Sequence, residues 1–174
     1  MTENSITLTP DHDASFKTFS DALADKVRRA RARMFCDFAF YAGGTRENVG
    51  DIPSLEKLEG SAGIKVFMGA STGTLLVQDD EGIEQVLRHI NRRAAFHSED
   101  EYRLADRRPL ARTGDWTSHY EVRDAQSAIQ STERLVRLAT ALGKRIHVLH
   151  VTTAEEMIYL AAHKDVASVE DGGE

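Results

Sequence analysis

Short apolar runs alternate with segments of helical periodicity along this chain, and this alternation constrains the fold more than any other feature. The runs start near residues 35, 63, 93, 145 and 165, and most are bounded by glycine or rich in aromatic and β-branched residues, as strands are. Apolar residues at helical spacing fill most of the intervals between them. Strands that alternate with helices predict an α/β fold in which helices cover a parallel sheet.

The pattern divides the chain into a leader and one domain. Residues 1–19 show neither helical nor strand periodicity, and we expect them to be a disordered leader. Residues 20–174 are expected to form a single domain whose first helix is capped by Ser20. Residues 98–118 are polar and without periodicity, which predicts a long irregular connection of the kind that often serves function.

Local signals give two further expectations at the ends of elements. Thr153 and Glu156, three residues apart at the start of a helical run, have the pattern of a capping box. Residues 35–41 are aromatic-rich and followed by a glycine pair, which is typical of a strand. Cys36 within this run is expected to be a small buried hydrophobe.

Composition excludes several classes of protein. The 174 residues carry 22 basic and 28 acidic side chains, so the net charge of −6 gives no reason to expect a nucleic acid or an anionic membrane as partner. The chain has no run of the ~18–20 apolar residues that cross a bilayer. A single cysteine excludes an internal disulfide and makes the cytoplasm the expected compartment. A complete (β/α)₈ barrel typically needs ~250 residues, more than are present.

Three polar side chains lie in or at the ends of predicted strands, namely Lys65, His97 and His150. A lysine is costly to bury as an ammonium, whereas its neutral amine reacts with a carbonyl or with carbon dioxide. Neutral imidazole is a common zinc ligand, and the ends of neighbouring parallel strands converge. A metal or catalytic site and a purely structural set of hydrogen-bonded side chains both remain open. His147 is expected on the opposite side of the sheet from His150, packed against a helix.

Three motifs, in this order, resemble those of the dihydroorotases of the amidohydrolase superfamily. They are GIKVFMG at Gly63–Gly69, FHSEDE at Phe96–Glu101 and VLHVTTAEE at Val148–Glu156. The resemblance extends from about Ala22 to Glu170 and is nearest to the bacterial type that includes multifunctional-complex forms.

The resemblance implies a fold and a site. The fold is a partial (β/α)₈ barrel with about five of the eight βα units, strands three to seven. Members of the family hold one or two zinc ions; here His97 and His150 as ligands, with Lys65 as a possible carboxylated bridge, would hold at most one ion, weakly. Glu99 or Asp100 would hold the ligands in place from outside, although an acid pair at a helix N-terminus explains these two residues equally well.

The resemblance also implies an activity, the reversible hydrolysis of dihydroorotate to N-carbamoyl-aspartate in pyrimidine biosynthesis. Hydantoinase or allantoinase activity on a related cyclic amide is an alternative. The His-x-His pair of the family's first strand and the general-base aspartate of its eighth strand are missing, so we identify no catalytic residue. We therefore expect a chain truncated at both ends that does not hydrolyse dihydroorotate alone. A non-catalytic structural partner of aspartate carbamoyltransferase and a homo-oligomer that completes the barrel are further alternatives.

Overall fold

The computed structural model describes residues 18–31, 33–69 and 75–171, and it has the predicted α/β architecture. Five parallel strands lie side by side in chain order. The expected leader lies almost entirely outside the described residues. The strands are β1 (Phe40–Gly43), β2 (Ser61–Phe67), β3 (Ala94–His97), β4 (Ile146–Val151) and β5 (Ala167–Asp171).

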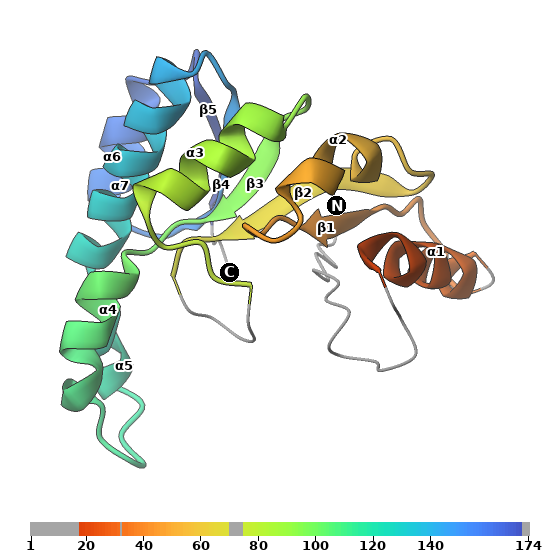
Figure 1. Ribbon diagram of the computed structural model, residues 1–174. Helices are drawn as coiled ribbons and strands as arrows, with labels where there is room; N and C mark the ends of the chain where they lie inside the picture. The colour runs from red at the N-terminus through yellow and green to blue at the C-terminus, as the bar shows by residue number, and fades with distance from the viewer. Residues whose placement is uncertain (1–17, 32, 70–74, 172–174) are drawn as a thin grey trace.

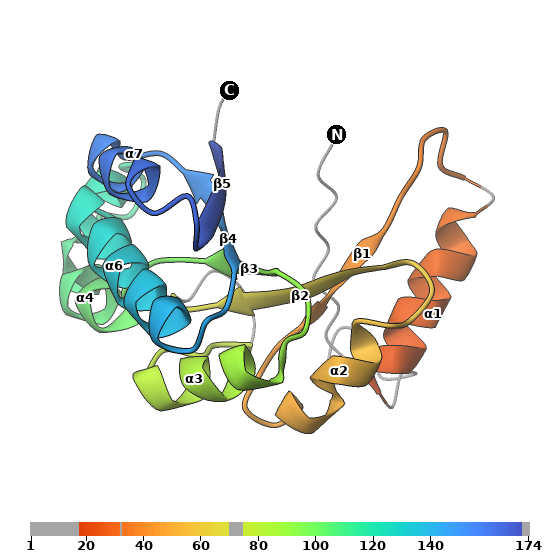
Figure 2. The same cartoon turned by 90° about the horizontal axis from the view of Figure 1, so that it is seen from above.

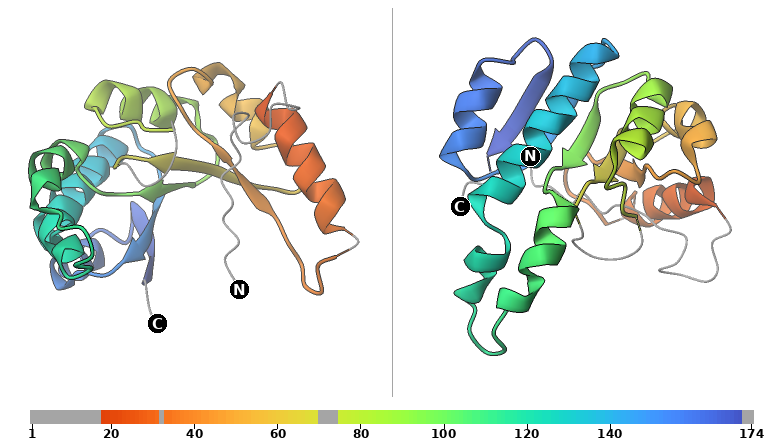
Figure 3. Two further views of the ribbon diagram at one scale, coloured as in Figure 1. Left: turned by 90° about the horizontal axis from the view of Figure 1, so that it is seen from below. Right: turned by 60° about the vertical axis from the view of Figure 1, so that its left-hand side comes forward.

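Helices cover one face of this curved sheet, on its convex side (Figures 1 and 2). A short arm formed by α4 and α5 extends beyond the sheet (Figure 3, right). No helix in the described part of the chain is both long and apolar enough to span a membrane. The helices are α1 (Phe19–Ala30), α2 (Ile52–Leu55), α3 (Asp80–His89), α4 (Glu101–Arg107), α5 (Ser118–Val122), α6 (Ala125–Ala141) and α7 (Ala154–Ala161), with 3₁₀ turns η2 (Val49–Asp51) and η3 (Arg108–Leu110).

The two faces of the sheet differ in chemistry because strand side chains alternate between them. Ile64, Val66, Phe96 and Val148 are fully buried and belong to one apolar cluster with the helices. Burial of each such side chain contributes about 1.5–3 kcal/mol. The intervening residues, Lys65 among them, face the opposite, open side of the sheet, so polar side chains collect there.

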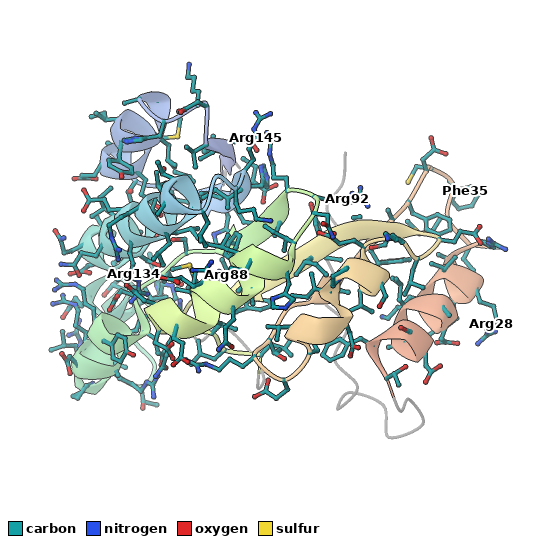
Figure 4. The ribbon with its side chains drawn as sticks, turned by 45° about the horizontal axis from the view of Figure 1, so that its top comes forward. Arg28, Phe35, Arg88, Arg92, Arg134 and Arg145 are labelled. Atoms are coloured by element: carbon teal, nitrogen blue, oxygen red, sulfur yellow. The ribbon has the colours of Figure 1, made fainter. Side chains whose placement is uncertain are left out.

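The first strand is shorter than the sequence predicts. β1 pairs with β2 from Phe40 onward, and Phe40 lies opposite Ser61, the first residue of β2. Residues before Phe40 therefore have no neighbouring strand with which to pair. Phe35 and Cys36 are exposed, and the ring of Phe35 points away from the domain (Figure 4). The prediction of a buried cysteine in a strand that starts at residue 35 is wrong.

Helix starts also differ from the sequence-based expectation. Thr18, not Ser20, caps α1, because its extended backbone places its hydroxyl to accept from the N–H of Asp21. The predicted irregular connection after β3 contains α4. Asp100 caps this helix by accepting from the N–H of Arg103 at 2.9 Å, and Leu104 buries its side chain. One cap and one apolar anchor are sufficient for a short helix, and its otherwise polar surface hides the periodicity.

Candidate functional site

Two predicted residues meet at the carboxyl ends of neighbouring strands. His97 is the last residue of β3 and His150 is near the end of β4. The Nδ1 of His97 lies 2.8 Å from the Nε2 of His150, and the ring centroids are 4.7 Å apart. The structure therefore brings these two imidazoles into direct contact, as convergence of parallel strand ends predicts.

His150 reaches this position through a break in its strand. Val148 pairs with Val169 and Val151 with Asp171, so two residues of β4 lie opposite one residue of β5. This is the arrangement of a β-bulge. His150 itself has a φ of 40°, a conformation that non-glycine residues rarely adopt. Regular alternation would place His150 on the helix-covered face with Val148, and the bulge turns it toward His97 instead.

His147 does not pack against a helix, and the prediction that it does is wrong. Its register partner Ala95 is paired with Lys65 on the next strand, so all three lie on the open face. Its Nδ1 lies 2.8 Å from Ser168 Oγ, and its Nε2 lies 3.5 Å from a carboxylate oxygen of Glu170. The bulge that follows His147 reverses the alternation on which the prediction depended.

Lys65 lies in the middle of β2 and is only 8% exposed. Its Nζ is 5.1 Å from the centroid of the Phe67 ring, and this ring is 5.8 Å from that of His97. An ammonium at this distance from an aromatic face is stabilised by a cation–π contact. Its positive charge also contributes to the lowered pKa of His150. Lys65 thus belongs to the same neighbourhood as the imidazoles.

The two acidic residues after β3 have different positions. Glu99 Oε2 lies 2.7 Å from the Nε2 of His97 and forms a close ion pair with the guanidinium of Arg123. Asp100 instead caps α4 and lies 3.5 Å from Arg134. Glu99 therefore touches an imidazole directly, whereas Asp100 occupies the helix N-terminal position that was its alternative role.

The electrostatics of the site favour an ionised Glu99 and a neutral His150. Burial alone would raise the pKa of Glu99, but its contact with His97 and nearby positive charges, chiefly those of His97 and Arg123, outweigh burial and lower it. Desolvation, followed by the charge of His97, lowers the pKa of His150. A neutral imidazole, as favoured for His150, is the form of histidine that binds a metal.

A cavity of about 500 Å³ opens beside the imidazole pair. Sequence reasoning missed three residues that line it. Arg123 follows α5, in a stretch predicted to be helix, and His119 is exposed, as a surface histidine is. Glu156 was recognised only as a helix cap. The one available signal is that Glu156 is the last residue of the motif that contains His150, Val148–Glu156. The lining includes His97, Glu99, His119, Arg123, His150 and Glu156.

The imidazole pair fits a metal ion in part. In the described ranges, no group of three His, Cys, Asp or Glu side chains is arranged to hold one. The buried Nε2 of His97 nevertheless lacks an aligned hydrogen-bond partner in the described part of the chain, although Glu99 is close. Two nitrogens bound tetrahedrally at about 2.05 Å from zinc lie about 3.3 Å apart. A small opening of the 2.8 Å contact would therefore admit the ion.

The chain is similar to proteins named dihydroorotase and allantoinase. No family model matches the chain. A dihydroorotase of Methanosarcina mazei is 27% identical over 151 residues, and one of Methanosarcina acetivorans is 28% identical over 150. Both alignments cover 84% of this chain and 32% of the relative. An allantoinase of Rubrobacter xylanophilus is 29% identical over 149 residues, 80% of this chain and 32% of the relative.

Solved structures show the same fold over most of the chain. The L-hydantoinase of Arthrobacter aurescens superimposes with a TM-score of 0.77 at 22% identity, covering 87% of this chain and 36% of that one. The dihydropyrimidinase of Brevibacillus agri gives 0.76 at 20% identity, covering 89% and 36%. The predicted resemblance to dihydroorotases is confirmed, as is the fold expected from it. The chain spans about a third of the length of these curated relatives.

Proposed function

We propose that this chain, with its similarity to dihydroorotases, supplies part of the metal and substrate site of a cyclic-amide hydrolase, with dihydroorotate as the first candidate substrate. One observation carries the proposal: the contact between His97 and His150 at the ends of β3 and β4, beside an ionised Glu99 and an open cavity. Hydantoin and allantoin are alternative substrates, since the relatives and solved neighbours bear these names as well.

In this proposal, the residues of the site have separate tasks. His97 and His150 would hold zinc through the two nitrogens that now face each other. Glu99 would fix the ring of His97 from its other nitrogen, with Arg123 keeping the carboxylate in place. When bound, zinc polarises an amide carbonyl and lowers the pKa of a water molecule. Lys65, if carboxylated, would add an anionic ligand and offset the metal charge.

Cobalt titration of the purified full chain tests the proposal. Co²⁺ is a spectroscopic substitute for zinc, and its binding to nitrogen ligands is visible as an absorption band. We expect a band that is lost in His97→Asn and His150→Asn. The matched control is His89→Asn, since His89 lies on the exposed end of α3 and contacts only the carbonyl of Gln85 in the described structure. Binding that survives both substitutions would contradict the proposed site.

Turnover assays with dihydroorotate, hydantoin and allantoin then address the substrate. Hydrolysis of one of the three by the metal-loaded chain, lost together with the cobalt band in His97→Asn, would identify the substrate.

A non-catalytic role beside aspartate carbamoyltransferase is the second candidate. The observation that favours it is that the imidazoles hydrogen-bond to each other and Glu99 is paired with Arg123, so these groups have partners within the chain. A chain that binds no cobalt but co-purifies with a carbamoyltransferase would support this role over the hydrolase.

A further inference from the structure

A chain of hydroxyl groups connects the segments that follow the two imidazoles. The Oγ of Ser98, the residue after the β3 imidazole, lies 2.9 Å from the Oγ1 of Thr132 in α6. Thr132 donates to Glu156 Oε1 at 2.7 Å. Thr153, three residues after the β4 imidazole, donates to Glu156 Oε2 at 2.8 Å. A single carboxyl group in α7 therefore connects the ends of both strands.

Glu156 is placed for more than a helix cap. In a capping box, the glutamate reaches back to the backbone N–H of the cap residue. Thr153 does accept from the N–H of Glu156, as predicted, but both carboxyl oxygens of Glu156 bind hydroxyl groups instead. Glu156 is 3% exposed, whereas Glu155 in the same turn is exposed. A buried carboxyl is costly unless it is fully hydrogen-bonded, so an ordinary cap would be more stable on the surface.

The number of hydroxyl protons limits the directions that the hydrogen bonds of this network can take. Each hydroxyl has one proton, and an ionised Glu156 accepts those of Thr132 and Thr153. The proton of Ser98 has two acceptors within reach, Thr132 Oγ1 at 2.9 Å and Ser131 Oγ at 3.1 Å; when it is donated to Thr132, the hydrogen bonds run toward the carboxylate. Burial raises the pKa of Glu156, with Glu99 and Glu155 adding to the rise, while the two threonine hydrogen bonds oppose it. A neutral glutamine of the same shape can also occupy this place, because its amide both donates and accepts.

We propose that Glu156 is a positioning residue that, through Thr132 and Thr153, fixes the separation of His97 and His150. The need for such a residue follows from the backbone of β4. A non-glycine residue at a φ of 40° persists only where its surroundings hold it in place. That the His97–His150 contact serves metal binding rests on the proposed function. The positioning of the two rings by Glu156 is a property of the metal-free chain.

The test is a nuclear magnetic resonance measurement on the full chain without metal or substrate. The proton shared by His97 Nδ1 and His150 Nε2 should give a resolved imidazole signal protected from exchange with water. We expect Glu156→Leu to lose this signal and Glu156→Gln to retain it. The matched control, Glu155→Leu, changes an exposed residue of the same turn and should retain it. Retention of the signal in folded Glu156→Leu would overturn the proposal.

A second variant covers the case in which Glu156→Leu does not fold. Thr132→Val keeps the shape of the side chain and removes only the link between Ser98 and Glu156. It should shift the ring signals of His97 at temperatures where circular dichroism shows a folded chain. Unchanged ring signals in folded Thr132→Val would refute positioning through this network. The readout needs no metal, so a chain without cobalt binding would contradict the proposed function while leaving this result intact.

Discussion

The two histidines of the candidate site reach the same cavity from strands that end in different ways. At the end of β3, His97 follows the regular alternation of its strand, with Phe96 directed into the apolar core on the other face. At the end of β4, one extra residue and a φ of 40° turn His150 toward the cavity. One imidazole is held by side-chain packing and the other by an unusual backbone conformation.

This difference shows when the alternation of residues along a strand predicts the face of the sheet on which a side chain lies. Alternation gives the face of a side chain only while the hydrogen-bonded register continues. A bulge shifts the alternation by one residue, which is why Val148 and Val151 lie in the same core cluster although three positions separate them. Bulges are frequent beside active sites because they re-aim a side chain, and the His150 bulge does so here.

The largest effect should come from the packing that holds β3. Phe96 is fully buried in the main cluster, so Phe96→Ala should lower the free energy of unfolding by about 3–5 kcal/mol. Phe67 is half-buried on the open face and contacts His97 and Lys65, so Phe67→Ala should cost clearly less. Urea denaturation of both variants measures the difference. Equal losses would show that the helix-covered face does not dominate the stability of β3.

The next largest effect is that glycine and valine variants should have opposite orders of stability at the two strand ends. At position 150, valine should be less stable than glycine by about 1–2 kcal/mol, because an L side chain is strained at positive φ. At position 97, in a regular strand, glycine should be less stable than valine by about 0.5–1 kcal/mol. Both pairs of variants lack the imidazole, so the opposite orders do not depend on the histidine ring. Thermal unfolding of the four variants is the measurement, and the same order at both positions would contradict the bulge.

The sequence predicts the elements and the meeting of His97 and His150, but not the means by which they meet. Glycine-bounded apolar runs identify β2, and a long apolar stripe identifies α6, because burial alone determines them. No sequence signal indicates the bulge at His150, since the residue at positive φ is neither glycine nor asparagine. Arg123 follows α5, which packs against α4, and Glu156 lies on α7, which packs against α6; these contacts between helices are not encoded in the local sequence pattern.

A smaller effect concerns the ion pair that holds Glu99 beside His97. Arg123 and Glu99 have side chains that are 25% and 15% exposed, so Arg123→Gln should cost about 1 kcal/mol, near the upper end for partly exposed pairs. The control is Arg88→Gln, whose partner Glu84 lies one turn away on the exposed face of α3; it should cost about 0.3–0.5 kcal/mol. Equal costs in chemical denaturation would mean that the Arg123 pair contributes no more than a surface pair.

The smallest effect is confined to two windows of pH, one for each strand end. Desolvation and the charge of His97 lower the pKa of His150 below its ordinary value of 6.5. At the β3 end, burial would raise the pKa of Glu99, but contact with His97 and the positive charges of His97 and Arg123 together lower it below its ordinary value of 4.5. Both groups bind protons more weakly in the folded chain than in the unfolded one. Stability is therefore complete above each ordinary value and falls as the pH decreases toward the lowered folded value.

The unfolding temperature of the metal-free chain, measured from about pH 8 to about pH 3, should accordingly fall in two steps. Replacement of His150 by asparagine removes the step that begins near the ordinary histidine value and leaves the acidic step in place. Glu99→Gln removes the contribution of Glu99 to the acidic step and keeps the first. Asparagine tolerates positive φ better than most residues, so His150→Asn changes the titration without undoing the bulge. If His150→Asn leaves the first step unchanged, protonation of the β4 imidazole is not its cause, and the two strand ends do not differ in the way proposed.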